Sequence, residues 1–181
     1  HTDDGIDGIR MAFHKKNRLD MIPLGRKIIE KGYKFFIQPM ITLRYSDAEL
    51  LELINLVNTE LSDASGFYIV DSFGSLYPEQ IRRIAELYLE YGDKYGKKVG
   101  IHAHNNQQCA FANTIEALSI GTSFLDATYC GMGRGAGNCS IEALIGFLKN
   151  PAYRLSPVLK FIENEMLPLR ASGITWGYDI P

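Results

Sequence analysis

The sequence predicts an α/β fold, specifically the C-terminal part of a TIM (β/α)8 barrel, and three observations lead to this prediction. Short apolar stretches rich in β-branched and aromatic residues alternate with longer amphipathic stretches. Their starts lie roughly 25–33 residues apart, which is the length of one strand–helix unit. A complete barrel takes about 250 residues, whereas the chain has 181. We therefore expect about five C-terminal units here and three further units before them.

The expected strands are the short stretches, and the helices between them have readable ends. The strands are expected at residues 8–13, 34–40, 66–70, 98–104 and 123–129. Ser46 and Glu49 form a capping-box pattern, Pro78 suits a first helical position, and Gly32 suits the position after a helix. The helices are expected at residues 19–31, from 46, from 78, at 107–120, at 140–149 and at 156–170.

Alternating strands and helices indicate a parallel sheet covered by helices. An open doubly wound sheet competes with the barrel, although the unit length fits the barrel well. We assign residues 1–150 to a partial barrel domain and 151–181 to a helical extension that looks truncated. Five strands alone would leave two open edges, so we expect a homo-oligomer or association with the missing N-terminal half of the barrel.

Composition excludes several classes of partner. Hydrophobic residues make up 46% of the chain, charged residues 22%, and the net charge is −2. This balance gives no reason to expect nucleic acid or an anionic membrane as a partner. No apolar run approaches the length of a membrane span, and the first residues show no basic-then-apolar pattern, so we expect no signal peptide. The 3 cysteines contain no CxxC pattern, which favours a reducing, cytoplasmic setting.

The fourth expected strand carries the most informative pattern. His102 and His104 are two residues apart and therefore share one face, while Ile101 and Ala103 face the other way. Both histidines lie at the carboxyl end of the strand, where barrel active sites are found. Two neighbouring imidazoles suit a divalent cation. The alternative is a pair of core histidines that are satisfied by their neighbours.

A glycine-rich loop, residues 131–138, follows the fifth expected strand. Its alternating glycines permit positive φ angles and close approach to a ligand, so Gly133, Arg134 and Gly135 are candidates for binding an anionic substrate. The spacing is not that of the dinucleotide-binding fingerprint. Asn138 at the end of the loop either caps the next helix or supplies a third metal ligand.

Three more polar residues at or near strand ends are candidates for catalysis. Asp71 could orient a metal-bound histidine or water, or could cap the turn that follows it. Arg10, one of the polar residues within the strands together with Gln38 and Asp126, could orient a carboxylate. Tyr129 could donate a hydrogen bond near the site or could simply pack.

The segment Gly100–Asn106, the strand end Leu125–Thr128 and the loop Gly131–Asn138 together resemble the DRE-TIM metallolyases, also called HMGL-like proteins, over roughly residues 8–150. Within that family the loop is most similar to the 4-hydroxy-2-oxovalerate aldolase-like branch. The resemblance implies that His102, His104 and Asn138 bind Mn²⁺ or Mg²⁺, in preference to Zn²⁺ or Co²⁺. Lyases of the family that act on the methylglutaryl thioester carry a loop cysteine, and Met132 and Gly133 stand in that neighbourhood here.

The same resemblance implies an activity. A divalent ion would hold an α-keto acid and stabilise the pyruvate enolate that forms when a carbon–carbon bond breaks, as in the cleavage of a 4-hydroxy-2-oxo acid. The family's Arg and Asp from the first barrel strand are expected outside this chain. Two alternatives stay open: a barrel-derived ligand-binding module without catalysis, and a phosphate-binding enzyme of another barrel family.

Overall fold

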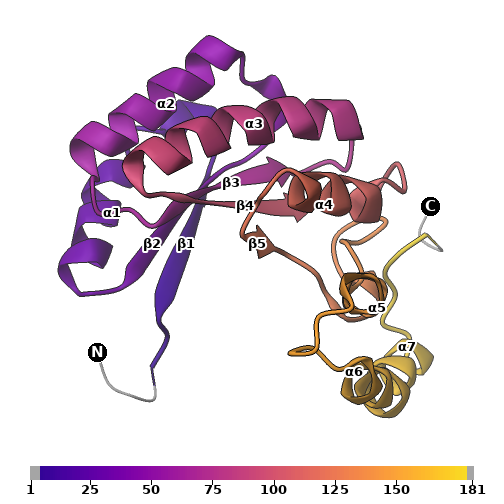
Figure 1. Ribbon diagram of the computed structural model, residues 1–181. Helices are drawn as coiled ribbons and strands as arrows, with labels where there is room; N and C mark the ends of the chain where they lie inside the picture. Colours follow the sequence, from indigo (N-terminus) through magenta and orange to yellow (C-terminus); the bar gives the residue numbers. More distant parts are fainter. Residues whose placement is uncertain (1–4, 179–181) are drawn as a thin grey trace.

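The computed structural model describes residues 5–178 and contains one five-stranded parallel sheet (Figure 1). The strands are β1 (Gly8–Phe13), β2 (Lys34–Pro39), β3 (Gly66–Asp71), β4 (Lys98–Ala103) and β5 (Phe124–Leu125). Their spatial order is β1-β2-β3-β4-β5, the same as their order along the chain. A doubly wound sheet would reverse its strand order at a switch point. The sequential order confirms the prediction of a partial barrel wall.

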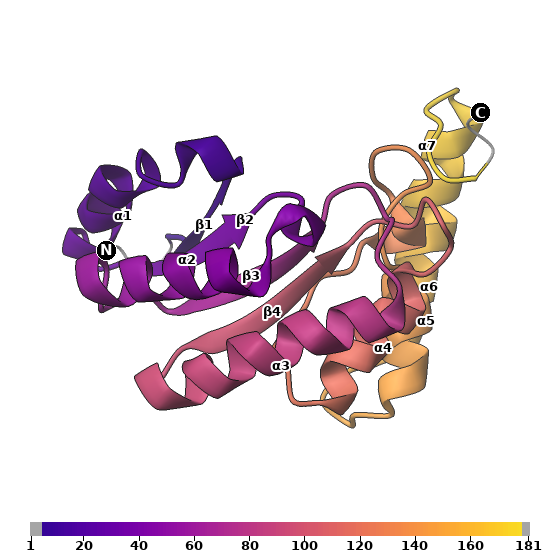
Figure 2. The same ribbon diagram turned by 90° about the horizontal axis from the view of Figure 1, so that it is seen from above.

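Four helices cover one face of this sheet, as Figures 1 and 2 show. They are α1 (Met21–Glu30), α2 (Asp47–Glu60), α3 (Pro78–Tyr95) and α4 (Ala110–Ser119). Single 3-10 turns occur at Lys15–Asn17 (η1), Thr42–Arg44 (η2) and Tyr129–Gly131 (η3). Within the described residues no helix lies over the opposite face, which corresponds to the inside of the barrel.

The predicted helix signals are present in the structure. The Ser46 hydroxyl accepts a hydrogen bond from the Glu49 amide, and the Glu49 carboxylate accepts one from the Ser46 amide. Pro78 occupies the first turn of α3, where its missing amide hydrogen costs nothing. Gly32 follows α1 with a φ of 82°, a conformation that residues with a Cβ rarely adopt. Local chemistry therefore sets these boundaries.

The core lies between the sheet and its helices. Every second strand residue points into it, and these side chains have exposures of 0–1%. They are Phe35, Ile37, Phe67, Ile69, Val99, Ile101 and Ala103. Burying each large side chain of this kind contributes about 1.5–3 kcal/mol. The alternate residues of the strands point to the opposite face of the sheet, which corresponds to the inside of the barrel.

Aromatic rings gather on the inner face. Phe36, Tyr68 and Phe124 come from three strands, with ring centroids 6.1 Å apart for Phe36 and Tyr68 and 5.2 Å apart for Phe36 and Phe124. Gly100 leaves room for the Tyr68 ring, because a Cβ on Gly100 would lie 2.6 Å from it. The guanidinium of Arg10 lies 4.9 Å from the centroid of the same ring. The inner face thus combines an apolar floor with a charged group.

The fifth strand is shorter than the predicted residues 123–129. Only Phe124 and Leu125 pair with β4. Further along, Thr128 forms a bridge with Ser140, and its amide donates to the Cys139 carbonyl. The chain leaves β4 because its later residues pair with the returning end of the glycine loop, a long-range partner that the local sequence does not indicate.

The fourth helix was predicted to begin at Gln107, but it begins at Ala110. Gln108 has a φ of 58°, which interrupts a right-handed helix at this point. The Asn105 side chain instead accepts a hydrogen bond from the Ala110 amide. Residues 105–109 therefore form a turn that leads away from the histidine strand.

The part of the chain after the sheet is helical. It contains α5 (Ile141–Leu148), α6 (Leu155–Phe161), the π-helical segment η4 (Ile162–Met166) and α7 (Leu167–Ala171). The π segment lies just before Pro168, which has no amide hydrogen to donate within a regular helix. A division of the chain at residue 150 stays a prediction. None of the helices formed by residues 5–178 is both long and apolar enough to cross a membrane.

Candidate metal centre

The two predicted histidines lie side by side at the carboxyl end of β4. The ring centroids of His102 and His104 are 5.2 Å apart, and the ring planes are inclined by 79°. The alternation predicted for this strand is confirmed, because Ile101 and Ala103 are buried under the helices. The side chain of His102 keeps 27% of its surface exposed. The pair therefore opens to the inner face of the sheet rather than to the core.

A carboxylate orients the first of these histidines. The Asp126 carboxylate lies 2.9 Å from Nδ1 of His102, and a carboxylate can only accept at this distance. The carboxylate therefore favours a proton on Nδ1, which leaves Nε2 as the ligand atom of a neutral ring. Arg10 donates from one guanidinium nitrogen to both oxygens of Asp126, at 2.6 and 2.5 Å. Strands β1 and β4 are thus connected through a residue that follows β5.

The second histidine lies against the end of the glycine loop. His104 forms an antiparallel bridge with Asn138. Within the described residues, Nδ1 of His104 and Oδ1 of Asn138 are buried and have no hydrogen-bond partner. Burial lowers the pKa of His104 and the nearby His102 lowers it further, while backbone hydrogen bonds with Arg134 and Gly137 oppose the effect without reversing it. A neutral imidazole is favoured here, which is the form that binds metal ions.

These donors fit a divalent cation. Two buried polar atoms without partners are costly unless a ligand satisfies them. Imidazole nitrogen and amide oxygen are both ordinary ligands of divalent metals, and the His102 ring lies beside that of His104. Residues 5–178 contain no group of three or more His, Cys, Asp or Glu side chains placed to hold a metal. The described donor set therefore consists of two histidines and one asparagine.

The glycine loop packs closely on its own side chains. A Cβ on Gly133 would lie 2.6 Å from the Asn138 amide nitrogen, and one on Gly135 would lie 2.8 Å from the Asn106 oxygen. Gly137 has a φ of 87°, and a Cβ there would lie 2.0 Å from the Gly131 carbonyl. The glycines allow the loop to fold around Asn138, whose Nδ2 donates to the Met132 carbonyl.

Several loop amides and side chains already have partners. The amides of Ala136, Gly137 and Asn138 donate to Asn106, Arg134 and Gly131 respectively. Arg134 donates to the Ser72 carbonyl at 2.6 Å and lies over the Phe73 ring. Because these groups are engaged within the protein, the loop has fewer free donors for an anion than its sequence suggests.

Asp71 and Tyr129 have local roles in the structure. The Asp71 carboxylate accepts from the amides of Ser75 and Leu76, so it caps the turn after β3. Burial raises its pKa, and those backbone hydrogen bonds oppose the effect. The Tyr129 ring packs on Phe161, with centroids 4.4 Å apart. For both residues the structure shows the local alternative that the sequence left open.

Of the two alternatives that the sequence left open for Asn138, capping of the following helix is excluded by the structure. The N-cap of α5 is Ser140, and no side chain caps this helix end. Asn138 lies two residues before this N-cap, because its backbone pairs with His104. Its side chain therefore stays with the histidine pair.

The sequence did not single out two residues that organise the site. Asp126 was recognised only as a polar residue within a strand, yet it connects Arg10 to His102. Asn106 donates to the Phe73 carbonyl and accepts from Ala136, so it joins the β3 and glycine loops. The signal for Asp126 was a charge at a strand end that shares the inner face with the histidines.

Comparison with known proteins agrees with this geometry. The model of the HMGL-like family matches residues 14–162, which include both histidines and the whole glycine loop. The chain belongs to the HMGL-like family. This confirms the resemblance that the histidine strand and glycine loop indicated.

Relatives within this family include two named lyases. The HMGL-like chain is 48% identical over 82 residues to an oxaloacetate decarboxylase of Mycobacterium tuberculosis, a stretch that covers 45% of the chain and 24% of that protein. It is 39% identical over 106 residues to a 4-hydroxy-2-oxovalerate aldolase of Thermus thermophilus, covering 56% of the chain and 30% of that protein. The alignments thus span less than a third of these curated relatives.

Solved structures show the same fold. The N-terminal domain of a candidate aldolase from Bacteroides vulgatus superposes with a TM-score of 0.79 at 32% identity, covering 95% of the chain and 56% of that one. A hydroxymethylglutaryl-CoA lyase from Pseudomonas aeruginosa superposes with a TM-score of 0.76 at 12% identity, covering 96% of the chain and 66% of that one. The second likeness shows the fold alone.

Proposed function

We propose that this HMGL-like chain supplies two histidine ligands and a loop asparagine to a divalent-metal-dependent carbon–carbon lyase acting on a 2-oxo acid. The observation that carries the proposal is the pair of buried, unpartnered donor atoms on His104 and Asn138 beside the oriented ring of His102. Mn²⁺ or Mg²⁺ is the proposed ion. When bound, it would act as a Lewis acid on the keto and carboxylate oxygens of the substrate.

The names of the relatives support one substrate class. Oxaloacetate and 4-hydroxy-2-oxovalerate both carry a keto group beside a carboxylate. Breaking the bond between C3 and C4 of either molecule leaves the three-carbon enolate of pyruvate, with carbon dioxide or an aldehyde as the other product. One site that stabilises this enolate would therefore serve both reactions. We propose a small 2-oxo acid of this kind as the substrate here.

The chain's own residues have distinct proposed roles. Asp126 holds the proton on Nδ1 of His102 and so directs Nε2 toward the ion, while Arg10 fixes Asp126. Arg10 is thus proposed to position a carboxylate of the protein. The glycine loop brings Asn138 to His104. Gly133, Arg134 and Gly135 stay candidates for contact with the substrate carboxylate, and Asp71 and Tyr129 for supporting roles.

The free cysteines support a proposed cellular location, and the exposed inner face of the sheet supports a proposed association. Cys109, Cys130 and Cys139 are all free thiols, which supports a proposed reducing, cytoplasmic location. We also propose that the inner face of the sheet is completed by further barrel units or by another copy of the chain, because Phe124 is 38% exposed there.

Manganese titration, followed by electron paramagnetic resonance of the free ion, tests the metal assignment. His102→Ala should weaken binding at least tenfold, because it removes one of the few ligands. His14→Ala is the matched control, since His14 is an exposed histidine after β1. Equal binding by the unmodified chain and His102→Ala would contradict the proposal, as would a comparable loss in the control.

Release of pyruvate from oxaloacetate and from a 4-hydroxy-2-oxo acid tests the reaction. It can be followed by reduction of the product with a coupled dehydrogenase. We expect Mn²⁺-dependent release that His102→Ala abolishes and His14→Ala preserves. Metal binding without release from either substrate would favour the alternative of a ligand-binding module.

A further inference from the structure

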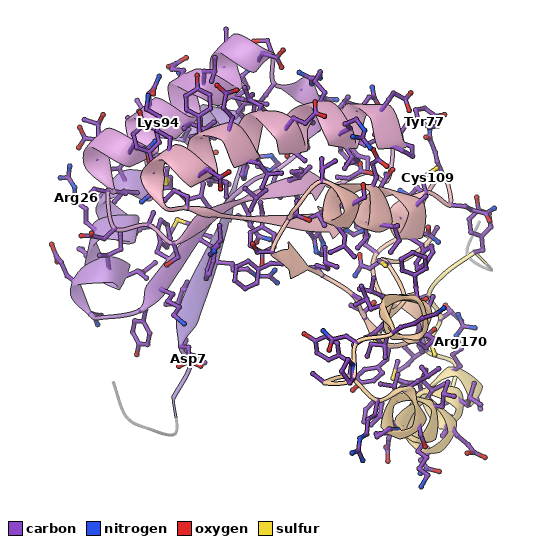
Figure 3. All side chains as sticks on the ribbon, in the orientation of Figure 1. Asp7, Arg26, Tyr77, Lys94, Cys109 and Arg170 are labelled. Atoms are coloured by element: carbon purple, nitrogen blue, oxygen red, sulfur yellow. The ribbon has the colours of Figure 1, made fainter. Side chains whose placement is uncertain are left out.

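The C-terminal segment returns to the candidate site after α7. Figure 3 shows Arg170 on these last helices, far from Arg26 and Lys94 at the other end of the molecule. Beyond α7 the chain turns at Gly173, which has a φ of 96°, and residues 174–178 run back toward the glycine loop. Trp176, the 1 tryptophan of the chain, is only 3% exposed.

The three hydrogen bonds that this segment donates fall on or beside the loops around the candidate metal centre. The indole nitrogen of Trp176 donates to the Cys130 carbonyl at 3.0 Å, just before the glycine loop. The Gly177 amide donates to the Gly135 carbonyl at 3.3 Å, in the middle of the loop. The Tyr178 hydroxyl donates to the Asn106 carbonyl at 3.3 Å. The segment therefore holds the loop at Gly135, the residue before the loop at Cys130, and the neighbouring turn at Asn106.

Arg170 on α7 holds residues 174–178 in place through two contacts with Trp176. Its guanidinium donates to the Trp176 carbonyl at 2.8 Å and lies 4.7 Å from the centroid of the indole ring. A cation over an aromatic ring and a hydrogen bond from the same side chain restrict the indole to one orientation. The indole donor is thus aimed at Cys130, a non-glycine residue with a φ of 52°.

The tip of the loop stays open to solvent despite the internal contacts of its other residues. Arg134 and Gly135 are exposed. A cavity of about 240 Å³ separates the loop from the C-terminal segment, and Asn138, Arg170 and Tyr178 are among its lining residues. Loosening the segment would let the loop move into this space and carry Asn138 away from His104.

We propose that residues 174–178, fixed by Arg170, form a clamp that holds the glycine loop and thereby positions Asn138 for the metal. Trp176 is the positioning residue. The role of the clamp in metal binding rests on the proposed function. The clamp contacts themselves do not, because they are made within the protein and need no metal. The helical extension is therefore a working part of the site.

Amide hydrogen exchange, measured by mass spectrometry on the 181-residue chain, tests the clamp without any metal. Trp176→Phe keeps an aromatic ring and removes the indole donor. We expect the amides of residues 131–138 to exchange about three- to tenfold faster, the effect of losing one net hydrogen bond. The amides of β3 should keep their protection. Tyr153→Phe, at an exposed tyrosine outside the clamp, is the control and should change neither region.

A second variant covers the case in which Trp176→Phe unfolds. Arg170→Gln removes the guanidinium from the indole and should produce the same local pattern. Unchanged loop exchange in both variants, or loss of protection throughout the molecule in both, would overturn the clamp.

Manganese titration of the same variants separates the clamp from the proposed function. We expect Trp176→Phe and Arg170→Gln to weaken Mn²⁺ binding and Tyr153→Phe to leave it unchanged. If the variants show faster loop exchange but the unmodified chain binds no Mn²⁺, the proposed function is contradicted and the clamp is supported. If all variants bind Mn²⁺ with equal affinity and show unchanged loop exchange, the clamp is contradicted and the proposed function is unaffected.

Discussion

The two faces of the parallel sheet are built from alternate residues of the same strands, yet they are organised differently. Toward the helices, side chains such as Phe67 and Ile101 are fully buried and apolar. Toward the inside of the barrel, the next residues in the chain are Tyr68 and His102, which meet a ring, a guanidinium or a carboxylate. The helix-covered face holds the hydrophobic core, and the inner face holds the residues of the candidate site.

This difference follows from what each face has to satisfy. Apolar packing on the covered face is non-directional, and many side chains share it. On the inner face, Arg10, Asp126 and His102 depend on one another through directed hydrogen bonds. Loss of one partner there changes the orientation of the next. Substitutions on the covered face should therefore affect folding, and those on the inner face should affect the site.

The largest effect is expected on the covered face. Phe67→Ala should lower the free energy of unfolding by about 3–5 kcal/mol, because it leaves a cavity in a core where Phe67 is 0% exposed. Phe36→Ala, on the inner face of the neighbouring strand, should cost less because that ring is only partly buried. Urea denaturation measures both values. Equal losses would remove the distinction between the faces.

The next effect is expected at the carboxylate of the inner face. Asp126→Asn should weaken Mn²⁺ binding about 10–100-fold, because the amide no longer fixes the Nδ1 proton of His102. Asp93→Asn removes the same charge from an exposed position on α3 and should leave binding unchanged. Calorimetric titration of both variants makes the comparison. An affinity for Asp126→Asn equal to that of Asp93→Asn would show that the carboxylate does not orient the ring.

A smaller effect is expected where the inner face is crowded. Gly100→Ala would place a Cβ 2.6 Å from the Tyr68 ring, so the ring must shift to admit the new methyl group. We expect a loss of about 1 kcal/mol, at the low end for overpacking. Combining it with Tyr68→Leu should recover part of this loss in a double-mutant cycle. Strict additivity of the two substitutions would mean that the ring and the new methyl group do not meet.

The smallest effect concerns thiol reactivity and leaves the fold intact. Burial raises the pKa of both Cys130 and Cys139. A raised pKa leaves less thiolate at a given pH, and only the thiolate reacts with iodoacetamide. Cys139 is 1% exposed, whereas Cys130 lies on the rim and is partly exposed. Mass spectrometry at pH 8 should find Cys130 alkylated before Cys139, and the reverse order would show that the core around Cys139 opens before the rim does.

Much of the fold could be predicted from local signals in the sequence. The capping box at Ser46, the proline at the start of α3 and the glycine after α1 each fix an element boundary through neighbours only a few residues away. The alternation of Ile101, His102 and Ala103 assigned each side chain to its face, because the side-chain period of a strand is 2. The same alternation identified the histidine pair.

Only the tertiary structure decided which polar groups meet. Arg10 and Asp126 lie 116 residues apart in the chain, and the parallel sheet brings them together. The short fifth strand and the place of Asn138 both depend on pairing with distant segments, Ser140 with Thr128 and Asn138 with His104. The return of Trp176 to Cys130 is of the same kind. The sequence by itself determined the elements and the faces of the strands, because caps and periodicity act over a few residues. The partners of the charged and polar groups were decided by the fold, because a hydrogen bond between distant segments leaves no local pattern.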